Sequence, residues 1–128
     1  VRALKPLSLV YFAAFFLVGC ALASIGPTMI LLAESTGSTP SQVALLFPAR
    51  SCAYLAGAAI GGPMFDRLPG NAILGVSMLL CGLGMLLVPV VHNLVLLALA
   101  VSTSGLAMGV LDTGGNVLLM RLHGAEVS

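Results

Sequence analysis

Four long apolar runs, almost free of charge, constrain this chain more than any other feature of its sequence. They cover residues 7–33, 42–65, 72–91 and 94–120. Each run reaches the roughly 20 residues that a helix needs to cross a hydrocarbon core about 30 Å thick. The bilayer interior holds no water that could bond the backbone, so isolated spans of this kind must be helical. We therefore predict an all-α membrane protein with four transmembrane helices.

The composition excludes several classes of function. The chain is 59% hydrophobic and 7% charged, which is too little charge for the surface of a soluble domain. A net charge of +1 offers no basic field, so we expect no nucleic-acid partner. The acids and histidines form neither a metal-ligand spacing nor a catalytic constellation, so we expect no metal site, no cofactor and no enzyme. Three cysteines lie inside apolar runs, where we expect buried small side chains and no disulfides: Cys20, Cys52 and Cys81.

The loops indicate the orientation in the membrane. Basic residues occur before the first run, between the second and third, and after the fourth: Arg2, Lys5, Arg67 and Arg121. The other two loops, at residues 34–40 and 92–93, contain no lysine or arginine. Because cytoplasmic loops carry the excess of basic residues, we predict that both ends of this segment and its middle loop are cytoplasmic.

Small residues and prolines predict how the spans pack and bend. Helices in lipid associate through close contacts at small residues, because lipid tails are as apolar as the side chains. Small residues recur at helical spacing in three spans: Ala53, Gly57 and Gly61; Gly75 and Gly82; Gly105 and Gly109. Proline lacks a backbone donor and can kink a helix, which applies to Pro27, Pro48, Pro63 and Pro89.

Two charged residues lie deep inside the spans. Arg50 follows Ser41, near the outer end of the second run, by nine residues, and Asp112 precedes Arg121 by nine. At 1.5 Å per residue both are about 13 Å deep, near the bilayer midplane. Intramembrane charges are costly and usually functional, so we expect both to face a shared, wet interior where they can pair. A purely structural ion pair between the second and fourth spans is the alternative.

Asn116 follows Asp112 by four residues, so both project from one helix face. A carboxylate and an amide on one face can hold the hydroxyls of a polar solute or a cation. The amide can instead bond to a neighbouring helix. We take Asp112, Asn116 and Arg50 as the candidate solute-binding residues.

The middle loop carries the most specific motif. The segment Gly62-Pro63-Met64-Phe65-Asp66-Arg67-Leu68-Pro69-Gly70-Asn71 resembles the cytoplasmic signature G-x-x-x-D-R-x-G-R-R of the major facilitator superfamily. Gly70 lies one position later than the second glycine of the signature, and the final basic pair is absent. The resemblance implies a gating loop formed by Gly62, Asp66, Arg67 and Gly70, which ties neighbouring helices together, and Arg121 at the same membrane face could be a second partner for Asp66.

The fourth span carries a narrower resemblance. Residues 105–116 read G-x-x-x-G-x-x-D-T-x-x-N, which is similar to the fourth helix of the fucose-permease branch and of the sodium-dependent glucose transporter type. Gly19 and the string Ile25-Gly26-Pro27-Thr28 resemble the first helix of the glucose-transporter type. The resemblance implies that Asp112 and Asn116 lie in a sugar cavity and that Asp112 couples transport to Na⁺ or H⁺, although uniport stays open.

We therefore predict that residues 1–128 form a partial N-terminal bundle, part of a six-helix half of a twelve-helix facilitator fold. A chain that begins without methionine and stops in a polar stretch is expected to be truncated. Its function would be secondary transport of a small polar solute, a hexose by resemblance, through alternating access. Its partners would be the lipid bilayer, the solute and the remainder of its own chain.

Two other interpretations stay open at this point. One is a self-contained, homodimeric exporter of the small multidrug-resistance type, which carries its intramembrane acid in the first span. The other is a non-transporting tetraspan scaffold, which displays a long, cysteine-bearing outer loop. This chain has neither a first-span acid nor a long outer loop.

Overall fold

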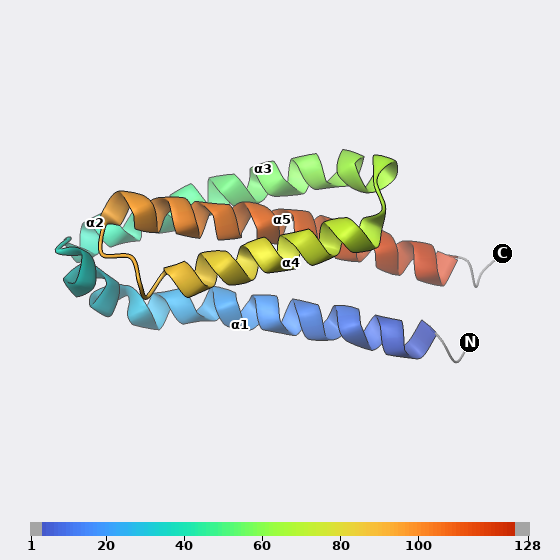
Figure 1. Cartoon of the computed structure of the whole chain (residues 1–128), viewed down its shortest axis with the longest axis horizontal. Coiled ribbons are helices and arrows are strands. Elements are labelled where there is room, and N and C mark those ends of the chain that lie inside the picture. The colour runs from blue at the N-terminus through green and yellow to red at the C-terminus, as the bar shows by residue number, and fades with distance from the viewer. Residues whose placement is uncertain (1–3, 125–128) are drawn as a thin grey trace.

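The structure, a computed structural model, describes residues 4–124, and all of the regular structure in this range is helical. In chain order the helices are α1 (Leu4–Thr36), α2 (Pro40–Ala44), α3 (Leu46–Arg67), α4 (Gly70–Leu87) and α5 (Leu94–Gly124). The four long helices lie side by side and alternate in direction (Figure 1). α1 and α4 run one way, and α3 and α5 run the other way. We call the end of the bundle that holds Arg67 and Arg121 the arginine end.

The predicted all-helical architecture with four spans is confirmed. Within residues 4–124, four segments are long and apolar enough to cross a membrane: Ser8–Thr36, Pro40–Arg67, Gly70–Leu87 and Leu94–Arg121. The largest difference from the predicted limits is at the third span, whose helix ends at Leu87 rather than at residue 91. Two turn bonds follow, from the N–H groups of Val90 and Val91 to the Leu87 carbonyl. Pro89 lies between Leu87 and these two valines and has no N–H, so it cannot continue the helical ladder.

The second span is divided at Leu45 into the short helix α2 and the long helix α3. α2 begins with a capping box, in which the Thr39 hydroxyl accepts from the Gln42 N–H and the Gln42 side chain accepts from the Thr39 N–H. The break follows from Pro48, because its ring nitrogen cannot donate to the carbonyl four residues earlier, that of Ala44. Pro48 therefore interrupts the predicted continuous span, whereas Pro27 and Pro63 lie inside α1 and α3.

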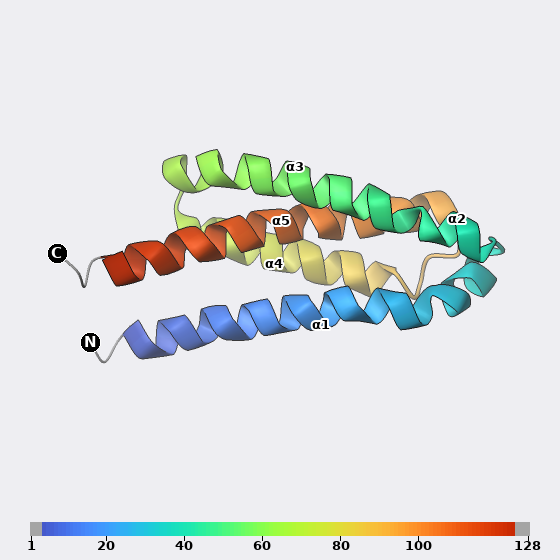
Figure 2. The ribbon, with the colours of Figure 1, turned by 180° about the vertical axis from the view of Figure 1, so that it is seen from behind.

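Helix α5 is the centre of the bundle. The most apolar stretch of its span, 18 residues long, is 56% buried, whereas the corresponding stretches of the other three spans are 19% to 28% buried. Seen from behind, α5 again lies beside α3 and α4 (Figure 2). The hydrophobic core forms two clusters along α5, one around Phe65, Met108 and Leu111 toward the arginine end, and one around Val43 and Leu97 at the opposite end.

Glycines bring α3 and α5 together, as predicted from their spacing. A Cβ atom added at Gly105 would lie 2.7 Å from the Arg50 carbonyl oxygen, and one at Gly109 would lie 2.7 Å from the Ala58 backbone nitrogen. On α3, Gly61 faces the same contact, because a Cβ added there would lie 3.3 Å from the Cβ of Thr113 on α5. The two backbones therefore approach more closely than any residue with a side chain would allow.

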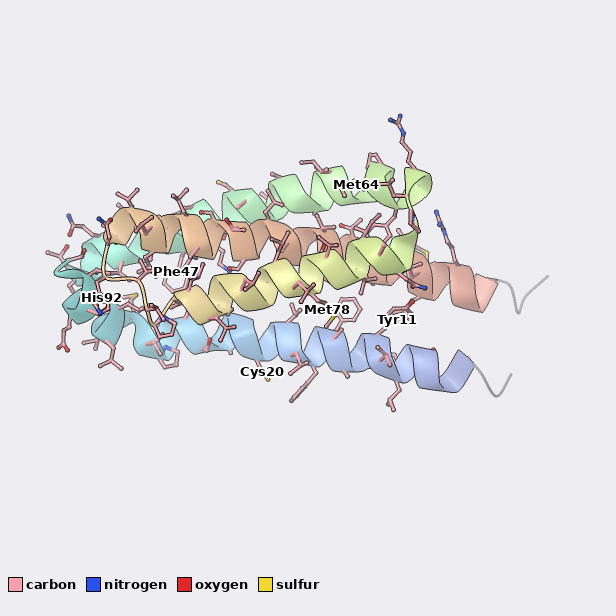
Figure 3. The ribbon with its side chains drawn as sticks, viewed as in Figure 1. Tyr11, Cys20, Phe47, Met64, Met78 and His92 are labelled. Carbon is pink, nitrogen blue, oxygen red and sulfur yellow. The ribbon has the colours of Figure 1, made fainter. Side chains whose placement is uncertain are left out.

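Two expectations about small residues are wrong. Gly75 and Gly82 do not mediate packing here, because a Cβ added at either would meet no atom within 4 Å. α4 instead contacts α5 at Gly84, where a Cβ would lie 2.9 Å from the Ser104 Cβ. Of the three free cysteines, Cys81 is buried as expected, but Cys20 and Cys52 are exposed. Cys20 points away from the other helices (Figure 3), since it lies on the face of α1 opposite α5.

Candidate functional site

Asp112 lies on the central helix α5 and is half-buried. Its carboxylate oxygen Oδ2 accepts a short hydrogen bond, 2.5 Å long, from the Tyr54 hydroxyl on α3. Tyr54 reaches this position because its backbone lies directly against Gly109, less than one turn before Asp112. A hydrogen bond to a charged acceptor is stronger than one between neutral groups. The acid predicted from the sequence is therefore held by a residue that the sequence interpretation did not include.

Arg50 lies one turn before Tyr54 on α3 and is almost fully buried, with 6% of its surface exposed. Its Nη2 atom donates to the Met108 sulfur at 3.1 Å. Arg50 and Met108 are 58 residues apart, as are Tyr54 and Asp112. The two parallel helices thus form two successive contacts, one helical turn apart.

The expected pairing of Arg50 with Asp112 is not formed. The reason is the axial register of α3 and α5: the Arg50 backbone lies against Gly105, its side chain ends at the Met108 sulfur, and Asp112 lies four residues beyond Met108. Four residues correspond to about 6 Å along a helix axis. The ion pair found within residues 4–124 instead joins Asp66 to Arg121.

Asn116 is exposed, one turn beyond Asp112 on α5. It lies on a face of α5 that the helices of this segment leave open. An amide group offers both donors and acceptors to a polar ligand. Its role in solute binding remains a prediction.

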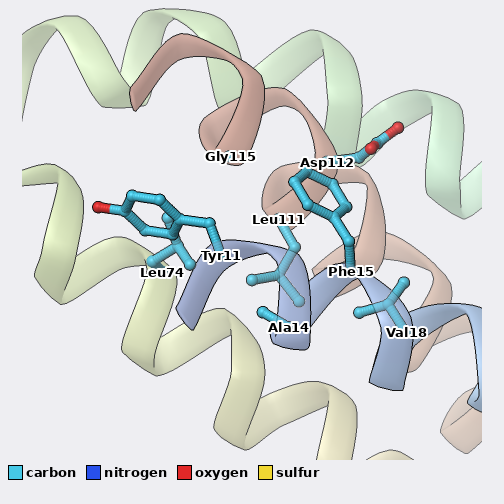
Figure 4. A pocket seen from close by; sticks show the side chains of 8 residues that line it. All are labelled: Tyr11, Ala14, Phe15, Val18, Leu74, Leu111, Asp112 and Gly115. Carbon is cyan, nitrogen blue, oxygen red and sulfur yellow. The ribbon is translucent and has the colours of Figure 1, made fainter. Parts of the chain in front are cut away.

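A pocket opens between α1, α4 and α5 beside Asp112. Its lining residues are Tyr11, Ala14, Phe15, Val18, Leu74, Leu111, Asp112 and Gly115. Figure 4 shows Asp112 at one side of this otherwise apolar pocket, with its carboxylate directed away from the other lining side chains. Phe15 approaches α5 closely here, because a Cβ added at Gly115 would lie 2.6 Å from the Phe15 ring. Asp112 is the one acidic or basic residue among those that line the pocket.

The motif at the arginine end connects α3 to α5. The Arg121 Nη2 atom donates to the Asp66 carboxylate at 3.0 Å, which confirms the partner expected for Asp66. Nη1 of the same arginine donates to the Phe65 carbonyl at 3.4 Å and so satisfies a terminal carbonyl of α3. Both charged side chains remain largely exposed, at 55% for Arg121 and 72% for Asp66.

The other three motif residues differ in their surroundings. At Gly70, the first residue of α4, a Cβ would lie 3.0 Å from Leu118 on α5 and 3.2 Å from Phe65. Gly70 therefore permits a tight junction between α3, α4 and α5. Gly62 faces open space, and Arg67 is exposed and makes no ion pair within residues 4–124.

Sequence reasoning missed Tyr54 and Met108. A signal was present, because Tyr54 follows Arg50 by four residues just as Asp112 follows Met108 by four. Equal spacing on two helices predicts two matched contacts once the register is known. The register itself required the structure.

Comparison with known proteins identifies the family. The Major Facilitator Superfamily profile matches residues 11–127. Sodium-dependent glucose transporter 1 of Xenopus laevis is 39% identical over 101 residues, which are 79% of this chain and 21% of that protein. Sodium-dependent glucose transporter 1A of Mus musculus is 39% identical over 113 residues, which are 88% of this chain and 27% of that protein. Major facilitator superfamily domain-containing protein 4A of Mus musculus is 34% identical over 124 residues, which are 95% of this chain and 24% of that protein.

The profile and these relatives confirm the family that the sequence resembled and its glucose-transporter-like branch. The chain spans about a quarter or less of the length of the curated relatives that it matches. No solved structure gives a significant match to it. Four apolar helices and the family profile together indicate an integral, multi-pass membrane protein of the transporter class. The chain belongs to the Major Facilitator Superfamily.

Proposed function

We propose that this chain is part of a sodium-coupled transporter that moves a hexose across the membrane by alternating access. The observation that carries the proposal is the half-buried carboxylate of Asp112 on the central helix, beside a pocket that α1 helps to line. An ionisable group inside a membrane span typically marks an ion or substrate pathway. The names of the relatives support sodium as the coupling ion and glucose as the type of solute.

Asp112 would bind the sodium ion, because a carboxylate oxygen is a suitable ligand for a hard cation. Asn116, exposed one turn further along α5, would hydrogen-bond the hydroxyl groups of the sugar. Arg50 would reach a solute only if Met108 moved, since it is 6% exposed and bonded to that sulfur. The proposal therefore rests on Asp112 and Asn116.

The contact between Asp66 and Arg121 would act as a gate. We propose that the arginine end is cytoplasmic, because the basic residues that flank the spans gather there. An exposed ion pair contributes only about 0–1 kcal/mol, so it can break during each transport cycle at little cost. The gating loop would thus hold α3 and α5 together in one state of the cycle and release them in the other.

Hexose uptake tests the proposal directly. The complete reading frame that contains this segment would be reconstituted in vesicles, and labelled hexose uptake measured with and without an inward sodium gradient. We expect sodium-dependent uptake in the wild type and its loss in Asp112→Asn, which keeps the shape of the side chain but removes its charge. Glu34→Gln is the matched control, because Glu34 is an exposed acid at the opposite end of the bundle.

Each outcome of this assay has a clear meaning. Uptake that is equal with and without the sodium gradient would refute sodium coupling. Sodium-dependent uptake that persists in Asp112→Asn would remove Asp112 from the coupling site. A loss of uptake in Glu34→Gln as large as in Asp112→Asn would show that any lost acid has this effect, and would overturn the assignment.

A further inference from the structure

Three polar side chains lie close together on α3 and α5. Tyr54 on α3 donates its hydroxyl to Oδ2 of Asp112, and Asn116 lies one turn beyond Asp112 on the same face of α5. Oδ1 of Asp112 and the Asn116 amide form no hydrogen bond with any part of residues 4–124. Tyr54 and Asp112 are half-buried and Asn116 is exposed, so all three side chains reach the surface of the bundle.

This surface lies between α3 and α1. Seen from behind, α5 runs between these two helices, and α4 lies on the far side (Figure 2). α1 packs against Gly115 through Phe15, and further round α5 the ring of Phe65 on α3 packs against Gly114. The Asp112 carboxylate points away from the side chains that line the pocket (Figure 4). The polar groups therefore face the open side of α5 rather than that pocket.

Lipid is an unsuitable neighbour for this open side. Asp112 lies nine residues before Arg121, which places it about 13 Å deep in the membrane. Ionisable side chains at that depth are costly against hydrocarbon, and they typically face the protein interior or a water-filled cavity. We therefore expect the face that carries Tyr54, Asp112 and Asn116 to line a cavity that water and a solute can enter.

The bond to Asp112 determines what the Tyr54 hydroxyl can still do. A phenolic hydroxyl donates one hydrogen bond, and its oxygen can also accept. Because its proton is directed to the carboxylate, the oxygen is left as an acceptor for a group on the open side. Donation to a charged acceptor polarises the hydroxyl, and successive hydrogen bonds in a chain strengthen one another. A solute hydroxyl that donates to Tyr54 therefore gains more than it would at an isolated tyrosine.

We infer that Tyr54 is a solute-binding residue, whose hydroxyl oxygen accepts a hydrogen bond from one hydroxyl group of the hexose. This inference rests on the proposed hexose transport. The Asn116 amide binds a second hydroxyl of the same sugar. The two contacts are about 6 Å apart along α5, the rise of four residues, and a single sugar ring can bridge them. The pair thus selects a solute that carries several hydroxyl groups.

Monodeoxy derivatives of glucose, each of which lacks one hydroxyl group, test this contact. Equilibrium binding of labelled glucose to the purified full-length protein would be measured at saturating sodium, with each derivative as a competitor. For the wild type, we expect the derivative without the hydroxyl at Tyr54 to bind about three- to tenfold more weakly than glucose, because one hydrogen bond is lost. In Tyr54→Phe, glucose and this derivative should bind equally well.

A second variant gives the complementary pattern. The derivative that lacks the hydroxyl at Asn116 should still bind more weakly than glucose in Tyr54→Phe. In Asn116→Ala this second difference should disappear and the first should remain. A purely structural role of Tyr54 would weaken all of the sugars by the same factor, so it would leave every ratio unchanged.

The matched control is Thr103→Val, which also removes one hydroxyl and keeps the shape of the side chain. Thr103 is exposed on α5, nine residues before Asp112, and its hydroxyl donates to the Leu99 carbonyl at 2.8 Å. The control should keep every affinity ratio of the wild type. A ratio that disappears in the control as well would show that any missing hydroxyl has this effect, and would overturn the role of Tyr54.

The outcomes separate the inference from the proposed function. If the wild type binds no hexose, the proposed function fails, and the inference fails with it. If the wild type binds glucose but Tyr54→Phe has the same ratios, only the inference fails. Each ratio compares two sugars on one variant, so incomplete folding of that variant does not alter it. If Tyr11→Phe, on the wall of the pocket, removes a ratio instead, the solute lies in the pocket and the inference is overturned.

Discussion

The contact between Gly109 and α3 is the most sensitive point in the bundle, and Gly109→Ala tests it. An added Cβ would overlap the Tyr54 carbonyl oxygen and would lie 2.7 Å from the Ala58 nitrogen, whereas ordinary contact begins at 3.4 Å, so α3 and α5 must separate by more than about 0.7 Å. The atoms in the way belong to the backbone of Tyr54 and Ala58, so no side chain can rotate aside. Overpacking of this kind costs about 1–3 kcal/mol. We expect Gly109→Ala to lower the free energy of unfolding by about 2 kcal/mol.

The assay is denaturant unfolding in detergent micelles, followed by far-ultraviolet circular dichroism. Gly82→Ala is the matched control, because an added Cβ there meets no atom within 4 Å. Alanine also has a better helix propensity than glycine, by up to about 1 kcal/mol, so the control should be as stable as the wild type or slightly more stable. If Gly109→Ala and Gly82→Ala unfold with free energies within about 0.5 kcal/mol of each other, the helices are not in contact at Gly109, and the packing argument fails.

Two further predictions concern the arginine end and the cysteines. Asp66→Asn should lower the free energy of unfolding by less than about 1 kcal/mol, because the ion pair is exposed. It should nevertheless change the rate of hexose uptake. The double variant Asp66→Arg with Arg121→Asp, which exchanges the two charges, should restore much of the wild-type uptake rate. An unaltered rate in Asp66→Asn would argue against a gate. A maleimide probe should leave Cys81 unmodified in the folded protein and modify it after unfolding, because Cys81 is 7% exposed. Mass spectrometry of the labelled peptides reads this out, and rapid labelling of Cys81 under native conditions would contradict its burial between α4 and α5.

Much of the architecture follows from properties that act along the chain. The length and hydropathy of the four runs predicted the four helices, because a span in lipid must bond its own backbone and must reach across the membrane. The glycine spacing at Gly105 and Gly109 predicted the face of α5 that meets a neighbour. The motif around Asp66 predicted a contact at the arginine end, and the structure supplies it through Arg121.

Other features depended on how the helices are placed relative to one another. Cys20, Cys52 and Cys81 all lie in apolar runs, but only Cys81 turned out to face a neighbouring helix. Gly75 and Gly82 have helical spacing like the glycines of α5, and yet they face open space. An apolar position in a membrane span can face lipid or protein equally well, so hydropathy does not distinguish the two environments.

The sequence by itself determined the class of protein, the number of spans, the two intramembrane charges and the family. These depend on composition, on spacing within one helix and on motif residues, all of which are local. Only the tertiary structure decided that Tyr54, rather than Arg50, contacts Asp112. The physical reason is that side-chain partners across two helices depend on their axial register, and a shift of one turn, about 5.4 Å, exchanges every partner. The register is decided by the glycine contacts between α3 and α5 acting together. These contacts join residues from two separate segments of the chain, so neither segment alone determines the register.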